Sequence, residues 1–144
     1  MLMTATRDQL RALKLDAMAA AWEAQQQDPA MAQLAFDERL GLLVDAEWLA
    51  RENRRLTRAL QEAKLKLSHA SIEAIDHAAH RGLDKSLIRQ LATCRWIADH
   101  QGVIIVGATG VGKSFLACAL AHQACRQGYR ALYWRTPRLF HELA

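Results

Sequence analysis

The stretch that most constrains this chain is residues 103–116, VIIVGATGVGKSFL, where a β-branched run leads into glycines and then into an alanine-rich run. Its Gly107, Gly112, Lys113 and Ser114 match the G-x-x-x-x-G-K-[ST] spacing of a phosphate-binding loop. Glycines let the backbone curl so that successive N–H groups point at an anion, and the positive end of the next helix adds to the attraction. The stretch therefore predicts a buried strand, a phosphate-holding turn and a helix.

The residues expected to hold the nucleotide form the loop and the first helical turn: Gly107, Ala108, Thr109, Gly110, Val111, Gly112, Lys113, Ser114 and Phe115. In such a site Lys113 reaches the β- and γ-phosphates, and the Ser114 hydroxyl is a ligand of Mg²⁺. A nucleoside triphosphate with Mg²⁺ is therefore the expected ligand, and the loop does not distinguish ATP from other nucleotides because it contacts phosphates and not the base. The alternative is a strand-to-helix turn whose glycines serve packing only, and the flanking strand and helix patterns disfavour it.

Hydrolysis of a nucleotide needs a second, acidic element, an apolar strand that ends in Asp and is often followed by Glu. After Lys113 the only acidic residue is Glu142, which lies in a predicted helix. No arginine finger is identifiable. We therefore assign no catalytic residue, and the sequence leaves open whether the chain is an enzyme.

Composition limits the class of protein. Hydrophobic residues make up 51% of the 144 residues, which is enough for a core, and no apolar run is long enough to span a bilayer. The three cysteines form no C-x-x-C pair, and the histidines have no metal-ligand spacing. We expect a cytoplasmic protein with reduced thiols, no structural metal and no membrane association.

Helical periodicity predicts an N-terminal helical domain over residues 1–67, with one helix over 5–27 and another from about residue 30, separated by Asp28-Pro29. Large aromatic residues usually lie in the core, so Trp22 and Trp48 are predicted there, with a partner-facing role as the alternative.

The rest of the chain is predicted to be a linker, residues 68–85, and a truncated α/β P-loop domain, residues 86–144. Asp84 is expected to cap a helix over 85–98, and Gly128 to end the helix that follows the loop. Residues 130–134 are predicted to form a second strand, and Thr136-Pro137 to begin a last helix.

Four arginines crowd one stretch of the predicted N-terminal domain: Arg51, Arg54, Arg55 and Arg58. They are candidate contacts to nucleic-acid phosphates. The alternative is a solvated charged face in which Glu62 pairs with Arg58 or Lys66. Charge alone does not decide between them, and no aromatic residue is interleaved for base stacking.

The chain resembles the N-terminal part of IstB-type transposition helper ATPases, which are related to the DnaC helicase loaders within the AAA+ class. The resemblance rests on three segments: GATGVGKSFLACALAHQACRQG, the preceding RGLDKSLIRQLATCRWI, and FDERLGLLVDAEWLARENRRLTRALQEAKL. Ser114 stands where threonine is common in the family. The resemblance covers essentially all 144 residues.

The resemblance implies an ATP-binding protein that associates with double-stranded DNA, forms oligomers in its full-length relatives and assists a transposase of the same element. It also implies a sheet in which the P-loop strand and the next strand in sequence are not neighbours. Two other functions stay open, a DnaC-like replicative helicase loader fragment and a non-enzymatic module that binds DNA or a transposase.

Overall fold

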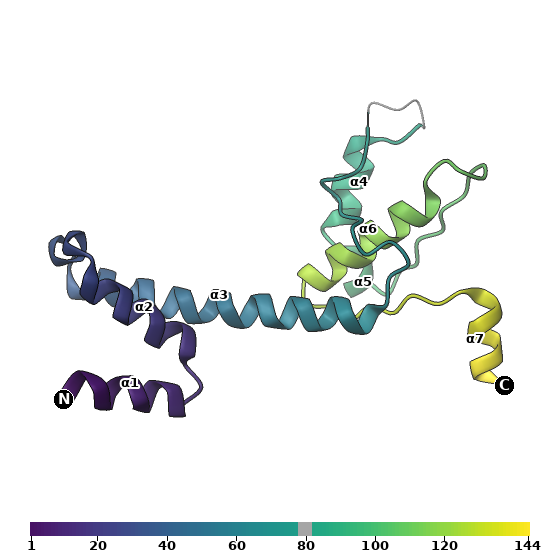
Figure 1. The fold of residues 1–144 in the computed structure, drawn as a ribbon. Coiled ribbons are helices and arrows are strands. Elements are labelled where there is room, and N and C mark those ends of the chain that lie inside the picture. The colour runs from purple at the N-terminus through teal and green to yellow at the C-terminus, as the bar shows by residue number, and fades with distance from the viewer. Residues whose placement is uncertain (78–81) are drawn as a thin grey trace. The chain divides into compact units, whose positions relative to one another are not determined.

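A computed structural model describes residues 1–77 and 82–144, and within this part the regular secondary structure consists of helices (Figure 1). The helices, in chain order, are α1 (Leu2–Ala12), α2 (Asp16–Gln27), the 3-10 helix η1 (Pro29–Gln33), α3 (Phe36–Ala63), α4 (Lys85–Ala92), α5 (Arg95–Ala98), α6 (Lys113–Arg126) and α7 (Thr136–Leu143). The chain divides into two compact units, Met1–Arg55 and Leu56–Ala144. This division falls inside α3, whereas the sequence predicted a helical domain that ends at residue 67.

The first unit is a helical hairpin. The Met18 N–H of α2 donates a hydrogen bond of 3.0 Å to the Glu47 carboxylate of α3, and the Gln25 side-chain amide donates one of 3.0 Å to the Arg39 carbonyl. Later residues of α2 thus meet earlier residues of α3, so the two helices run antiparallel (Figure 1). The predicted break at Asp28-Pro29 is confirmed, since Asp28 accepts the Ala30 N–H and caps η1.

The predicted helix over residues 5–27 is wrong in one respect, because the structure divides it into α1 and α2. Lys14 adopts a left-handed φ of 62°, and the Leu15 N–H donates to the Leu10 carbonyl at 2.9 Å, which closes the end of α1. The prediction for the two tryptophans is confirmed only in part. Trp22 is half-buried, but Trp48 is 69% exposed.

The second unit is built around α6. Cys118, Ala119 and Leu120 of α6 are buried, and the core of this unit continues into Ile88 of α4 and into the segment between α3 and α4. That segment was predicted to be a linker, yet its Ala70 is fully buried and its Ile75 is only 8% exposed. Residues 78–81 of the predicted linker lie outside the described residues.

The predicted helix ends of the second unit are largely confirmed. Asp84 accepts the Ser86 N–H at 2.9 Å and caps α4. Gly128, with a φ of 95°, follows the end of α6, and the Tyr129 N–H closes the turn onto the Ala124 carbonyl at 2.9 Å. The predicted helix over 85–98 is divided at Cys94, whose φ of 59° is left-handed.

The two predicted strands are wrong for the part of the chain that the structure describes, so the α/β sheet is not confirmed while the helical character is. Residues 103–106 and 130–134 belong to no helix and to no strand there. Each has one face turned inward, with Ile104 and Val106 exposed by 89% and 84% while Ile105 is half-buried. A strand is defined by the ladder of hydrogen bonds to a neighbour, and neither segment has one.

Among the described residues, no helix combines the length and the apolar character that a membrane span requires. Nor do the described residues contain a group of three or more His, Cys, Asp or Glu side chains placed to hold a metal ion.

Candidate functional site

The glycine-rich loop ends directly at the first turn of α6. Gly110 and Gly112 adopt φ values of 83° and 99°, a left-handed conformation that suits glycine and that turns the chain tightly enough to enter the helix. Gly112 is the N-cap of α6, and its carbonyl accepts the first helical bond, from the Leu116 N–H at 3.0 Å. The N–H groups of Lys113, Ser114 and Phe115 precede that bond, as the anion-binding end of a helix requires.

Lys113 reaches back across the loop. Its Nζ donates a hydrogen bond of 2.6 Å to the Gly107 carbonyl oxygen. A Cβ on Gly107 would lie 3.2 Å from Val111 Cγ2 and 3.7 Å from Lys113 Cδ, so glycine leaves room for this crossing. The amine is thereby placed at the loop while the Ser114 residue stays exposed to solvent at the start of α6.

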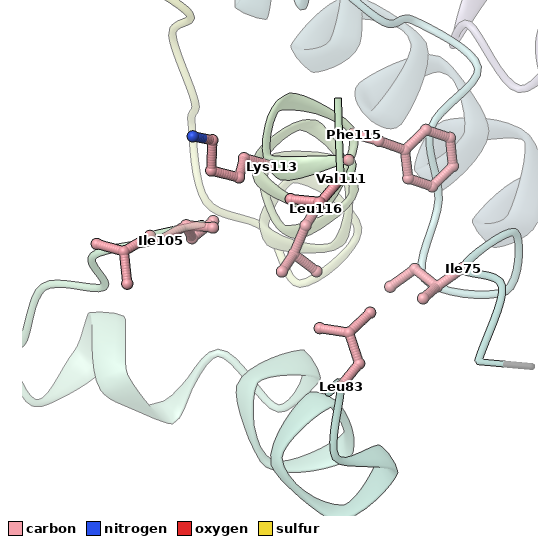
Figure 2. Close-up of a pocket in the computed structure, with 9 residues that line it drawn as sticks. Ile75, Leu83, Ile105, Val111, Lys113, Phe115 and Leu116 are labelled. Atoms are coloured by element: carbon pink, nitrogen blue, oxygen red, sulfur yellow. The ribbon is translucent and has the colours of Figure 1, made fainter. Parts of the chain in front are cut away.

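A largely apolar pocket lies next to the loop. The pocket is lined by Ile75, Leu83, Ile105, Val106, Val111, Gly112, Lys113, Phe115 and Leu116. Figure 2 shows Ile75 and Leu83 facing the side chain of Leu116, while the Lys113 amine points away from them. Residues Ile75 and Leu83, which precede α4, and residues at the start of α6 thus line the same pocket, with the Lys113 ammonium group at its edge. Ile75 and Leu83 are functional candidates that the sequence analysis missed, since nothing in the local pattern separates them from ordinary core residues.

The segment that carries Ile75 is tied to α6 by an ion pair. The Arg126 guanidinium donates to the Glu73 carboxylate at 2.6 Å, and this hydrogen bond is the main reason why the pKa of Glu73 lies below its ordinary value. Beside it, burial, with a smaller contribution from Arg126, lowers the pKa of His122. The contact holds one wall of the apolar pocket against the helix that begins at the loop.

The arginine cluster of α3 is partly neutralised by carboxylates. Arg51 Nε lies 3.1 Å and Arg54 NH2 3.7 Å from the same Glu47 oxygen, and Arg55 pairs with Glu52 at 3.2 Å. Burial alone would raise the pKa of the Glu47 carboxyl, but the Met18 N–H and the two guanidinium groups outweigh it, so this pKa lies below its ordinary value.

Arg58, the fourth member of the cluster, is exposed. The predicted partner of Arg58, Glu62, pairs instead with Arg130 at 3.5 Å. The cluster is thus divided between the two units, with Arg51, Arg54 and Arg55 in the first and Arg58 in the second.

A left-handed glycine turn that delivers three free N–H groups and a lysine to one point is typical of P-loop proteins. Residues 8–144 match the model of the family described as IstB-like ATP binding protein. The chain belongs to this family.

Curated relatives agree with the family. An ATP-binding protein of insertion sequence IS1162 from Pseudomonas fluorescens is 51% identical over 96% of this chain and 60% of its own length. An insertion-sequence ATP-binding protein from Sinorhizobium fredii is 43% identical over 100% of this chain and 58% of its own, and one from Mycobacterium tuberculosis is 35% identical over 97% and 55%. The chain therefore spans somewhat more than half the length of these relatives.

Proposed function

We propose that this chain is the nucleotide-binding part of an insertion-sequence helper protein and that it binds ATP with Mg²⁺ at residues 107–115. The observation that carries the proposal is the left-handed turn at Gly110 and Gly112, which opens into α6 with Lys113 at its first position. Family membership and the names of the relatives support the choice of ATP among phosphate-containing ligands.

In the proposed complex the phosphates lie in the loop, against the N–H groups at the start of α6. Lys113 exchanges its hydrogen bond with the Gly107 carbonyl for bonds to phosphate oxygens, which are charged and therefore stronger acceptors. The Ser114 hydroxyl, exposed one position further on, is the proposed Mg²⁺ ligand from this chain. Bound Mg²⁺ would neutralise part of the phosphate charge.

The adenine base is proposed to enter the apolar pocket beside the loop. Adenine is planar and weakly polar, and the pocket offers aliphatic surface from Ile75, Leu83 and Leu116. Gly112 and Lys113 of the loop line the same pocket. Phe115, whose ring lies 6.1 Å from that of His69, adds aromatic surface at the same pocket.

We propose that the chain by itself holds ATP without hydrolysing it. After Lys113 the sequence contains a single acidic residue, Glu142, and it lies on α7 rather than beside the loop. The residues available thus provide the binding half of a P-loop site and no second acidic group to place Mg²⁺ and water.

The wider role is proposed from the relatives, whose names describe ATP-binding proteins of insertion sequences. In that role the protein assists the transposase of its own element on double-stranded DNA and self-associates. The exposed guanidinium groups of the arginine cluster, although partly neutralised, remain candidates for phosphate contacts.

The proposal is tested by retention of nucleotide followed by analysis of what is retained. The chain is incubated with ATP and Mg²⁺, separated from free nucleotide, and the bound nucleotide is extracted. We expect it to be recovered as ATP after prolonged incubation. Recovery as ADP would contradict the absence of hydrolysis, and the absence of any retained nucleotide would contradict the binding site itself.

A further inference from the structure

A second pocket lies in the second unit, where the end of α3 meets the segment between α6 and α7. It is lined by Lys64, Leu132, Tyr133, Trp134, Arg135 and Arg138, and it shares no residue with the pocket beside the glycine-rich loop. The Tyr133 N–H donates to the Ala63 carbonyl at 2.8 Å, which fixes the two segments together.

Three of the lining residues are cations, and none of the described residues that line the pocket is a carboxylate. Within the described ranges, Lys64, Arg135 and Arg138 have no ion pair, whereas the neighbouring Arg130 pairs with Glu62 at 3.5 Å. Like charges that lie together without counter-charges repel one another. Binding of an anion in this pocket relieves that repulsion and is therefore favourable.

The same pocket presents aromatic surface. Trp134 is 37% exposed, and the Arg138 guanidinium lies 5.8 Å from the centroid of its ring. An arginine over an indole is a cation–π pair, and the arrangement keeps the ring and the charge together at one point. Proteins that bind single-stranded nucleic acid combine aromatic rings, on which the bases stack, with cations that contact the phosphates.

We propose that this pocket binds an unpaired strand of nucleic acid, with phosphates on Lys64, Arg135 and Arg138 and a base against Trp134. The proposal goes beyond the function proposed above, because it assigns a nucleic-acid site outside the arginine cluster and needs no nucleotide at the P-loop. A base stacks on an indole only when it is free of its own neighbours, so the site favours a single strand over a duplex.

The test is fluorescence anisotropy of a labelled oligothymidine, about twelve nucleotides long, titrated with the full chain at several salt concentrations. Three phosphate contacts predict a slope of log affinity against log salt of about −2 for a single strand. Replacing Arg135 or Lys64 with alanine is expected to reduce the magnitude of that slope by about 0.7 each. Trp134→Ala is expected to lower affinity about tenfold with the slope unchanged, and Trp134→Phe to lower it less.

Arg95→Ala is the matched control, since Arg95 is an exposed arginine of the same unit, 3.8 Å from Asp99 and outside this pocket. An equal loss in Arg95→Ala, or no loss in Trp134→Ala and Arg135→Ala, would overturn the proposal. So would tighter binding of the matching duplex that is insensitive to Trp134→Ala, or full competition by thymidine monophosphate at the concentration of the oligonucleotide. ATP retention by the same variants reports separately on the P-loop, so the two proposals fail independently.

Discussion

The Lys113 Nζ lies 2.6 Å from the Gly107 carbonyl oxygen, so the amine at the start of α6 closes onto the first glycine of the loop. In this position the Lys113 ammonium group already donates a hydrogen bond within the protein. An incoming phosphate has to displace the Gly107 carbonyl as acceptor, and it does so because a charged oxygen is the stronger acceptor. The lysine is therefore placed for the ligand before the ligand arrives.

The turn at Gly110 is the first test of the loop geometry. An added Cβ meets nothing within 4 Å, but the φ of 83° is costly for any residue with a side chain. Gly110→Ala is expected to lower ATP affinity about tenfold, which corresponds to about 1.4 kcal/mol. Gly102→Ala, also with open space but outside the motif, is the control, measured by the same titration. Equal affinities for the two variants would contradict the role of the turn.

The apolar pocket predicts that base and phosphates are bound by separate residues. Leu83→Ala removes aliphatic surface from the pocket without touching the loop, so ATP affinity should fall several-fold while the affinity for inorganic triphosphate stays unchanged. Calorimetric titration with both ligands measures the difference. A parallel loss for the two ligands would mean that Leu83 supports the loop and does not contact the base.

The Glu47 carboxylate predicts how the first unit responds to acid. Its pKa is below the ordinary 4.5, so its stabilising contacts are fully present above that pH and are lost as the pH falls through the folded-state pKa. Glu47→Gln should lower the thermal midpoint at pH 7 and make stability less dependent on pH between about 5 and 3.

The matched control for Glu47 is Glu52→Gln, on the same helix and with a side chain that is 46% exposed against 8% for Glu47. Circular dichroism at a series of pH values records both variants. If Glu52→Gln flattens the acid response as much as Glu47→Gln does, the buried carboxylate is not its source.

His122 predicts a second pH response, in the other unit. Burial lowers its pKa below the ordinary 6.5, so the neutral ring is favoured in the folded protein. The contribution of the neutral His122 ring to the stability of the fold is present above pH 6.5 and is lost as the pH falls towards the folded-state pKa. His122→Gln should therefore reduce the loss of thermal stability between about pH 7 and 5, whereas His141→Gln, on the exposed α7, should not. A steeper loss of thermal stability in His122→Gln over this pH range would contradict the attribution of the pH response to His122.

Local signals in the sequence predicted the loop, the caps and most helices, because each depends on residues close together in the chain. Gly112, Asp84 and Gly128 act where the patterns indicated. The breaks at Lys14 and Cys94 were not predictable in this way, since both are left-handed positions without the glycine that normally marks one.

Features that depend on distant residues were missed for a different reason. Residues 103–106 have the composition of a strand, but composition does not supply a hydrogen-bonding neighbour. The arginine cluster was visible in the sequence, whereas its neutralisation by Glu47 depends on how α2 and α3 pack. The second pocket, with Lys64 and Trp134 in its lining, does have a signal in the sequence, because Tyr133 and Trp134 stand beside Arg135 and Arg138.

We propose that the glycine-rich loop binds phosphate within these 144 residues. The most direct measurement is equilibrium binding of a fluorescent ATP analogue with Mg²⁺ to the chain, to Lys113→Ala and to Lys85→Ala, a control lysine at the start of α4. We predict saturable binding that Lys113→Ala weakens about tenfold or more and Lys85→Ala leaves unchanged. Absence of binding, or binding that Lys113→Ala does not weaken, would contradict the claim.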